Sequence, residues 1–258
     1  MVERPGRLDG RSTIVSGGAD GCGAAAARLF AGEGARVAIV DRQVSKGEAL
    51  AAEIRAGGGE AIFAEADVSK RDAVEAAVAA ATSAFGPPTA LFNHAGSIVV
   101  KPFLETTDEE YDWLMDVNVR SMFLMTRAVL PGMIEAGGGS IVCTSSISAV
   151  AATPAEVLYD TTKGAVHMFA RAIGVEFRDR NVRCNAVCPG FIATAHGNRE
   201  VELLSGFGVD ASEAAIRAAQ GRMCRPEEVA SAALFLLSDE ASFVNGAHLF
   251  VDNAFTAI

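Results

Sequence analysis

The 258-residue sequence is poor in the residues that mark metal-binding, extracellular and membrane-spanning proteins. It has five cysteines and four histidines, and no cysteines form a C-x-x-C pair, so a metal site is not expected. An odd number of thiols, most of them in apolar runs, instead predicts buried cysteines in a reducing compartment. No run of about 18 uncharged apolar residues occurs, so we expect no membrane span.

Basic residues are also scarce, since Lys and Arg total 22 against 32 Asp and Glu, for a formal net charge of -10. An acidic surface repels phosphate backbones and anionic membranes, so we expect no nucleic-acid and no membrane partner. The first ten residues, MVERPGRLDG, contain no apolar stretch. A signal peptide is therefore not expected, and the predicted location is cytoplasmic.

Hydrophobic residues, by contrast, make up 50% of the chain. Strand-like apolar runs alternate with Ala-rich helical stretches, without a linker between them. Because strands joined by helices form parallel sheets covered on both faces, we predict one α/β domain over residues 1–258. It would be doubly wound around a sheet of about seven strands. The expected strands are 12–16, 36–40, 61–64, 90–93, 140–144, 182–187 and 248–251, and the expected helices are 24–31, 45–55, 69–85, 107–134, 157–179 and 226–237.

Two of these helix predictions carry details of their own. Ser45 is expected to cap the second helix, with Glu48 completing a capping box. The helix over 107–134 is expected to be continuous and bent near Pro131. Residues 194–222 read as less regular.

A glycine-rich turn, Ser16-Gly17-Gly18-Ala19-Asp20-Gly21-Cys22-Gly23, follows the first expected strand and opens a helix. Glycines let a backbone approach a pyrophosphate closely, and a helix N-terminus offers free N–H groups and a positive dipole. The spacing is G-x-x-x-G-x-G, and a plain tight turn has the same composition. The turn alone therefore leaves both interpretations open.

Asp41 ends the second expected strand, where a carboxylate can accept hydrogen bonds from the adenosine ribose and repel a 2′-phosphate. Asp20 adds a second negative charge inside the turn. Arg42 could instead bind such a phosphate, and Asp41 could simply begin a loop. We favour the ribose role and therefore NAD, with NADP the less favoured cofactor.

Tyr159 and Lys163 lie four residues apart, on one helical face. A free Tyr has a pKa near 10, and a neighbouring ammonium group lowers it, so the pair can act as a general acid/base unit. The same spacing also arises by chance. Ser145 and Ser146 follow an expected strand, where a hydroxyl could hold a substrate oxygen or merely cap a turn.

In this order and at these spacings the motifs resemble those of the classical short-chain dehydrogenase/reductase family, over nearly the whole chain. The turn at 16–23 resembles T-G-x-x-x-G-x-G, with Ser in place of Thr. The other matching segments are Asp67-Val68, Asn93-His94-Ala95-Gly96, Asn118, Ser146, Tyr159 with Lys163, Asn185-Ala186-Val187-Cys188-Pro189-Gly190 followed by Thr194, and Arg225-Pro226-Glu227-Glu228-Val229-Ala230.

The resemblance implies a mechanism in which hydride passes between a substrate carbon and the nicotinamide. Tyr159 would exchange a proton with the substrate oxygen, and Lys163 would lower the Tyr pKa and hold the nicotinamide ribose. Ser146 would hold the substrate oxygen, and Asn118 would order a water near Lys163. The implied cofactor-binding residues are Gly17, Asp20, Gly21, Cys22, Gly23, Asp41, Arg42, Asp67, Val68, Asn93, Ala95, Gly96, Tyr159, Lys163, Pro189, Gly190, Ile192 and Thr194.

Three departures from the family's pattern concern the substrate end. His94 replaces an Asn, either to satisfy the sheet backbone or to tune the site near the nicotinamide. Cys224 stands where Gly is frequent, and Asn253-Ala254 replaces a frequent G-G pair. By analogy, residues 194–222 would form a substrate lid. The pocket would be bordered by His94, Ser148, Glu156, Phe191 and His196.

We therefore expect an NAD-dependent oxidoreductase that interconverts a small or medium secondary alcohol and a ketone. One alternative is a 3-oxoacyl-(acyl-carrier-protein) reductase using NADPH, which Asp41 and the lack of Lys and Arg in 131–140 disfavour. Another is a non-catalytic dinucleotide-binding regulator, which would be expected to lose Tyr159 or Lys163. The helices 107–134 and 157–179 are apolar all round, which indicates double-sided burial or a subunit interface. From the family we expect a homotetramer, or else a homodimer.

Overall fold

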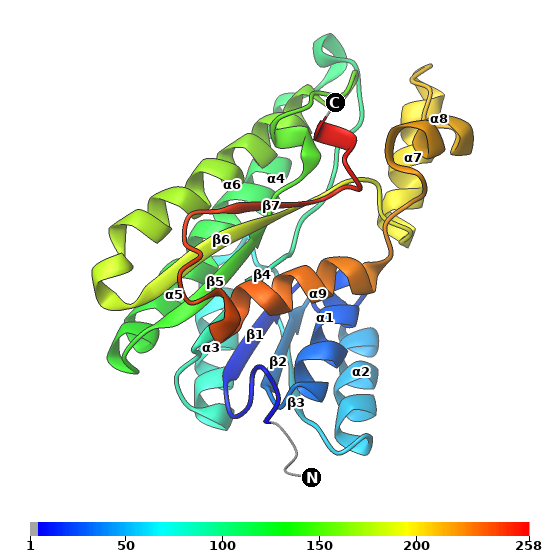
Figure 1. Cartoon of the computed structure of the whole chain (residues 1–258). Coiled ribbons are helices and arrows are strands. Elements are labelled where there is room, and N and C mark those ends of the chain that lie inside the picture. Colours follow the sequence, from blue (N-terminus) through cyan, green and yellow to red (C-terminus); the bar gives the residue numbers. More distant parts are fainter. Residues whose placement is uncertain (1–4, 258) are drawn as a thin grey trace.

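The computed structural model describes residues 5–257, so predictions touching residues 1–4 and 258 lie in part outside the described residues. Within that range, seven parallel strands form one sheet in the order β3-β2-β1-β4-β5-β6-β7 (Figure 1). The chain winds outward from β1 to β3, crosses to β4 and winds outward again to β7, which confirms the predicted doubly wound fold. The strands are β1 (Ser12–Ser16), β2 (Arg36–Asp41), β3 (Glu60–Glu65), β4 (Ala90–Asn93), β5 (Gly139–Thr144), β6 (Val182–Pro189) and β7 (His248–Val251).

Helices cover both faces of this sheet. They are α1 (Gly21–Gly32), α2 (Val44–Ala56), α3 (Arg71–Phe85), α4 (Asp108–Met115), α5 (Ser121–Glu135), α6 (Val157–Glu176), α7 (Ala195–Gly206), α8 (Glu213–Gln220) and α9 (Pro226–Leu237). Successive strand residues point to opposite faces, so Val15 packs with α1, α2 and α9, whereas Ile14 packs with α3, α5 and α6. Both faces are apolar, which explains why the strands read as continuous hydrophobic runs.

Within residues 5–257, none of the helices combines the length and the apolar character needed to cross a bilayer. In the same range, no three His, Cys, Asp or Glu side chains are grouped so that they could hold a metal ion. All five cysteines are buried and free, as their apolar surroundings predict.

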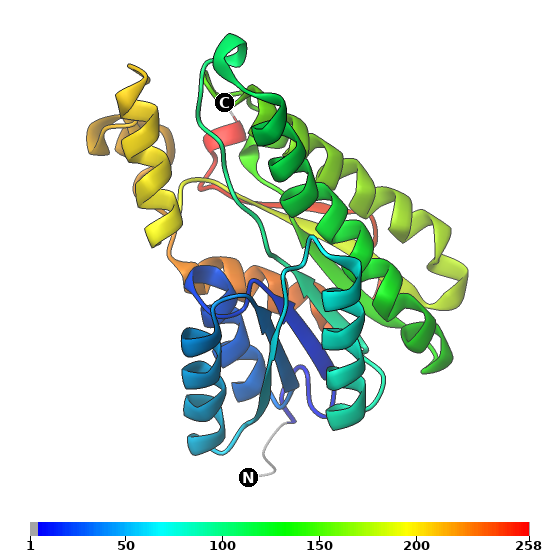
Figure 2. The same ribbon diagram turned by 180° about the vertical axis from the view of Figure 1, so that it is seen from behind.

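The helix predicted over 107–134 is interrupted. A π-helical turn (Asp116–Arg120) separates α4 from α5, although the two run on as one long rod, shown in green in Figure 2. Such a turn inserts one extra residue and is frequent at functional sites. It holds Asn118, whose side chain is bound to residues outside the helix. Pro131 lies inside α5, as expected.

Ser45 does not cap the second helix, which begins one residue earlier, at Val44, after an N-cap residue without a side-chain hydrogen bond. The turn before the helix is fixed by Asp41 instead, because its Oδ1 accepts a hydrogen bond from the Gln43 N–H at 2.9 Å. The first helix also begins early, at Gly21, because the Asp20 carboxylate caps it. Both differences arise from an acid placed just before a helix.

Residues 194–222 are more regular than predicted, since they contain α7 and α8. Each helix starts at a hydroxyl cap. Thr194 accepts a hydrogen bond from the Gly197 N–H at 3.0 Å, and Ser212 accepts one from the Ala215 N–H at 3.2 Å. The two helices project from the body of the chain as a separate pair (Figures 1 and 2). These helices were not predicted because they contain few apolar residues, so their periodicity is weak in the sequence.

Candidate active site

A cavity of about 320 Å³ opens where several strands reach their carboxyl ends. Because all strands are parallel, these ends meet at one edge of the sheet, and the chain reverses its winding between β1 and β4. The floor comes from residues that follow β1, β2, β4, β5 and β6. Helix α6 contributes Tyr159 and Lys163 to one wall, and α7 contributes His196 and Glu200 to another.

The glycine-rich turn forms the end of the cavity beside β1. Gly17 has a φ of 66°, and a Cβ atom there would lie 2.8 Å from the Ala95 Cα. A Cβ on Gly23 would lie 2.0 Å from the Gly17 carbonyl oxygen, so Gly23 allows helix and turn to pack but does not line the cavity. Asp20, Gly21 and Cys22 do line it. The Asp20 charge is offset by an ion pair with Lys46, so it adds less negative charge than the sequence indicates.

Exchange of Gly17 for Ala should disturb this turn. An L side chain rarely adopts a φ of 66°, and Ala95 leaves no room for the methyl group. We expect Gly17→Ala to weaken NADH binding at least about tenfold, measured by fluorescence titration, because backbone N–H groups at the turn are displaced. Gly32→Ala is the control, since a Cβ there meets nothing within 4 Å. Equal NADH affinity in the wild type, Gly17→Ala and Gly32→Ala would contradict the role of Gly17 in shaping the turn for the cofactor.

Asp41 lies at the end of β2 and borders the same cavity. Its Oδ2 accepts a hydrogen bond from the Ala19 N–H at 3.1 Å, and its Oδ1 accepts the one from Gln43. Each carboxylate oxygen keeps a further lone pair for a ligand. Arg42 also lines the cavity, as do Asp67 and Val68 after β3. The structure thus brings together the residues that were predicted for the adenosine end.

Asn93 itself lies outside the cavity wall, fully buried. Its amide donates to the Met122 carbonyl at 3.1 Å, and its Oδ1 accepts from the Ser16 hydroxyl. The Ser16 oxygen in turn accepts from the N–H groups of His94, at 2.9 Å, and Ala95, at 3.2 Å. Asn93 therefore shapes the loop after β4 from behind.

His94 lines the cavity and does not bind the sheet backbone with its ring. Its Nδ1 lies 2.9 Å from the Thr144 hydroxyl, and its ring stacks on Phe92 with centroids 4.9 Å apart. Burial, with the nearby Lys163 charge, lowers the pKa of His94 to about 3. The imidazole is therefore neutral at physiological pH. This favours a role for His94 as an uncharged polar part of the cavity wall and not as a group that responds to pH.

Asn118 is buried beside the catalytic end without lining the cavity. Its amide donates to the Ser97 carbonyl and to the Thr162 hydroxyl, each at 2.9 Å, and its Oδ1 accepts from the Ser97 N–H at 2.8 Å. These bonds join the π-helical turn, the loop after β4 and α6. A Cβ on Gly96 would lie 3.3 Å from the Asn118 Oδ1 and 3.6 Å from the Lys163 Nζ. The absence of a side chain at Gly96 therefore lets the loop after β4 pack closely against Asn118 and Lys163.

Tyr159, Lys163 and Ser146 meet in the cavity wall. The Lys163 ammonium group donates to the Thr144 carbonyl at 3.0 Å and lies 5.5 Å from the centre of the Tyr159 ring. The Ser146 hydroxyl accepts from the Ser148 N–H at 3.1 Å, which fixes it after β5. This is the arrangement that the Y-x-x-x-K spacing predicts.

The sequence predicts that Lys163 lowers the pKa of Tyr159, but the surroundings of Tyr159 in the structure raise it. Burial raises the pKa of the Tyr159 phenol well above its usual value, and Glu200 and Glu156 raise it further, whereas the Ser146 hydroxyl lowers it. Burial lowers the pKa of Lys163 to about 8. At neutral pH the chain alone therefore holds Tyr159 as a neutral proton donor beside an ammonium group.

The substrate end agrees in part with the prediction. Ser148, Phe191 and His196 line the cavity, as do Pro189, Gly190, Ile192 and Thr194 beyond β6. Glu156 does not line it, because its carboxyl is buried behind the wall. Glu200 lines the cavity and was missed by sequence reasoning. Its position one helical turn after His196 was the available signal.

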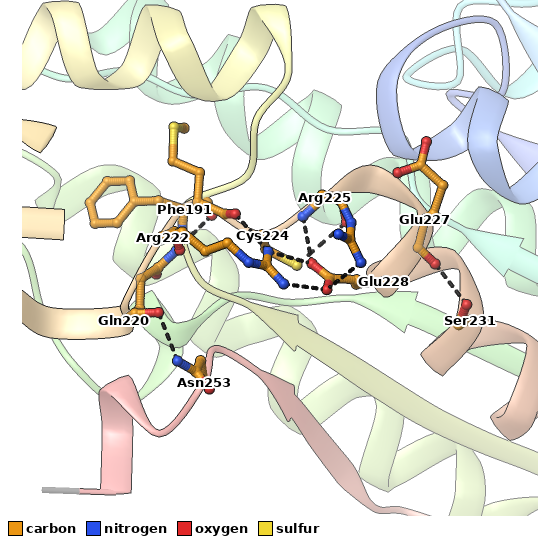
Figure 3. A network of polar contacts seen from close by, with 10 residues as sticks. Phe191, Gln220, Arg222, Cys224, Arg225, Glu227, Glu228, Ser231 and Asn253 are labelled. Atoms are coloured by element: carbon orange, nitrogen blue, oxygen red, sulfur yellow. Dashed lines mark hydrogen bonds and ion pairs between the residues drawn. The ribbon is translucent and has the colours of Figure 1, made fainter. Parts of the chain in front are cut away.

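A polar network holds the base of α8 against the sheet (Figure 3). The Gln220 side chain accepts from the Phe191 N–H at 3.0 Å and donates to the Phe191 carbonyl at 2.8 Å. Asn253 donates to the Gln220 carbonyl at 2.9 Å, and the Cys224 N–H donates to the Phe191 carbonyl at 2.8 Å. Asn253, a departure from the family's pattern, thus helps to fix the end of α8 through its side chain, whereas Cys224 contributes a backbone N–H that Gly would also supply.

Comparisons with known proteins identify the family of this chain. A family model described as enoyl-(acyl carrier protein) reductase matches residues 17–256. The chain is 40% identical over 252 residues to a cyclopentanol dehydrogenase of Comamonas testosteroni, covering 98% of this chain and 99% of that protein. It is 36% identical over 251 residues to 2,5-dichloro-2,5-cyclohexadiene-1,4-diol dehydrogenase LinX of Sphingobium indicum, covering 97% and 98%.

Among solved structures, levodione reductase matches with a TM-score of 0.92 at 32% identity, covering 97% of this chain and 99% of that chain. The match extends over the sheet, both helical layers and the cavity. The chain therefore belongs to the short-chain dehydrogenase/reductase family and is an oxidoreductase that acts on CH–OH groups.

Proposed function

We propose that the protein is an NAD-dependent dehydrogenase that interconverts a cyclic secondary alcohol and its ketone, with Tyr159 as the general acid/base. The observation that carries this proposal is one cavity shared by Asp41, Tyr159, Lys163 and Ser146. Dehydrogenases of this family use nicotinamide dinucleotides. The relatives named for cyclopentanol and for a cyclohexadiene diol support a ring alcohol as the substrate.

The residues present fit such a cofactor. Gly21 and Thr194 both line the cavity, and a Cβ on Gly21 would lie 3.3 Å from the Thr194 Cγ2, so glycine keeps the space between them open. Helix α1 begins at Gly21, where the N–H groups of its first turn can bind a phosphate. Asp41 supplies a carboxylate, placed by two backbone N–H groups, for ribose hydroxyls. When bound, the nicotinamide would supply or accept the hydride. Lys163, held by the Thr144 carbonyl, would bind the nicotinamide ribose.

The chain's own part in the reaction is to hold the substrate oxygen and move its proton. Ser146 would donate a hydrogen bond to that oxygen from a hydroxyl fixed by the Ser148 N–H. Tyr159, kept protonated by burial, would give its proton to a ketone oxygen, and in the other direction its phenolate would accept the proton of the alcohol. The Lys163 ammonium group would stabilise that phenolate.

Two other functions are less well supported. A carrier-protein-linked reductase using NADPH needs a basic docking surface and tolerance of a 2′-phosphate, whereas the chain is acidic and Asp41 borders the cavity. A non-catalytic dinucleotide-binding regulator would have no need for Tyr159 and Lys163 in one wall.

A panel of cyclic, aryl, sugar-derived, hydroxyacyl and steroid alcohols, with NAD⁺ and NADP⁺, tests the proposed function. NAD⁺ reduction by a cyclic alcohol supports it, and activity confined to hydroxyacyl thioesters with NADP⁺ refutes it.

We also propose a homotetramer, or a homodimer as the smaller form. Phe123 on α5 is 51% exposed, and Met168 and Val175 on α6 are 59% and 64% exposed. Large apolar side chains gathered on exposed helices indicate an interface. We expect light scattering at micromolar concentration to give about four times 26.7 kDa. A single-chain mass under these conditions would contradict the assembly.

A further inference from the structure

An acid at the substrate end has no part in the mechanism above. Glu200, on α7, is half-buried and lines the cavity with Tyr159 and Lys163. No hydrogen bond or ion pair within residues 5–257 holds its carboxylate. Among the charged groups, it has the largest effect on the pKa of Tyr159, which it raises. A carboxylate close to the reacting oxygen is thus left without a partner.

A second acid lies behind the first. Glu156 is the N-cap residue of α6 and precedes Tyr159 by three residues. Its side chain is 99% buried, since only 1% of the residue is exposed, and neither carboxylate oxygen has a hydrogen-bond partner in the described part of the chain. Buried polar groups are nearly always paired, so an unpaired one indicates a missing ligand or water.

The Glu200 carboxylate lies close enough to Glu156 to affect its pKa. Burial raises the pKa of Glu156 to about 9, and Glu200 and Asp160 contribute to the rise, although the nearby Thr153 side chain lowers it. Glu156 is therefore protonated at neutral pH and holds a proton without an acceptor. Burial also raises the pKa of Glu200, to about 7, while Lys163 lowers it. The partly ionised carboxyl group, Glu200, therefore lines the cavity with Tyr159, and the neutral one, Glu156, is buried behind the wall.

We propose that Glu200, with Glu156 behind it, binds a second hydroxyl group of the substrate, so that the enzyme prefers diols or hydroxy ketones to simple alcohols. This inference rests on the proposed function, since it places that hydroxyl beside the carbinol held by Tyr159 and Ser146. The hydroxyl would donate to the Glu200 carboxylate, which lines the cavity. One small group thus supplies the partner that this carboxylate lacks.

A hydroxyl group fits better than an amine. The Lys163 ammonium group already lies close enough to Glu200 to lower its pKa, so the two charges offset one another. An ammonium group on the substrate would add an unbalanced positive charge in a partly buried site, which is costly. A neutral donor and acceptor leaves the charge balance unchanged.

The test compares cyclopentanol with trans-1,2-cyclopentanediol, using NAD⁺ and the full chain. We expect Glu200→Leu to lower kcat/KM for the diol about 10- to 100-fold, the effect of losing a hydrogen bond to a charged group. The value for cyclopentanol should fall much less than the value for the diol, because only the effect of Glu200 on the pKa of Tyr159 is common to both alcohols. Glu200→Gln should restore part of the diol activity. Glu202→Leu is the matched control, because Glu202 is exposed on the same helix and lies outside the cavity.

Direct binding separates this inference from the proposed function. Calorimetry of the diol with the NADH-bound protein should show binding that Glu200→Leu weakens and Glu202→Leu leaves unchanged. If wild type oxidises neither alcohol, the proposed function fails, yet that binding pattern still supports the role of Glu200. Equal losses for both alcohols in Glu200→Leu, diol binding that the variant leaves unchanged, or tighter binding of trans-2-aminocyclopentanol than of the diol would each overturn it.

Discussion

Exchange of Tyr159 for Phe is expected to lower kcat for alcohol oxidation by about 10²- to 10⁴-fold, the usual contribution of a positioned general acid or base. The phenyl ring fills the same space in the wall, so the cavity keeps its shape. Only the hydroxyl that exchanges a proton with the substrate oxygen is lost. Steady-state NAD⁺ reduction with a cyclic alcohol measures the loss, and fluorescence titration should show that NADH still binds.

The chain offers a matched control for this variant. Tyr111, its other tyrosine, lies on α4, is 49% exposed and does not line the cavity. Tyr111→Phe should therefore retain wild-type kcat. Full activity in Tyr159→Phe would remove Tyr159 from the mechanism. Loss of both activity and NADH binding would show a disturbed fold, which the thermal midpoint of unfolding would report.

The sheet was predictable because parallel strands, buried on both faces, follow from the alternation of strands and helices along the chain. The bounds predicted for 12–16, 90–93 and 248–251 agree with the structure, and so do those of the helix that Pro226 begins. Apolar residues on both faces of each strand leave only one role for these segments, a parallel sheet between helical layers. In these segments, the structure favoured by the local sequence is the same as the structure favoured by tertiary packing.

The helix starts show where local rules failed. Ser45 and Glu48 match a capping box by sequence, but Asp41 fixes the preceding turn and the helix starts before Ser45. Likewise, the turn around Asn118 reads as ordinary helix. It takes up an extra residue because the Asn118 side chain binds Ser97 and Thr162, which are distant in the sequence. Both outcomes depend on tertiary contacts that periodicity does not contain.

In the candidate site, too, some contacts follow from the local sequence and others depend on the tertiary fold. Tyr159 and Lys163 share one helical turn, so their contact followed from spacing. Glu200 reaches the same cavity from α7. Its spacing relates it to His196 on the same helix but not to Tyr159 on α6, because only the fold brings these two helices to one cavity. His94 was foreseen as unusual, but its partner, the Thr144 side chain, comes from the neighbouring strand end.

The proposed preference for NAD would depend on the charge at Asp41, so Asp41→Asn should remove most of it. We expect the ratio of kcat/KM with NAD⁺ to that with NADP⁺ to fall about 100-fold. The variant loses charged hydrogen bonds to the ribose, each worth about 1.5–3 kcal/mol, together with the repulsion of a 2′-phosphate. The Asn side-chain oxygen can still accept one backbone N–H, and Arg42 beside it becomes free to bind the phosphate.

Glu65→Gln is the matched control for this change. Glu65 pairs with Asp41 in register at the end of β3, but it is exposed and lies outside the cavity. It should keep the wild-type cofactor ratio, which separates contact with the ribose from a general loss of negative charge. If wild type already binds NADPH more tightly than NADH, Arg42 dominates the site and the role given to Asp41 is wrong. If both variants shift the ratio equally, the long-range field of the acidic surface determines the preference, because only a contact effect distinguishes two acids at neighbouring strand ends.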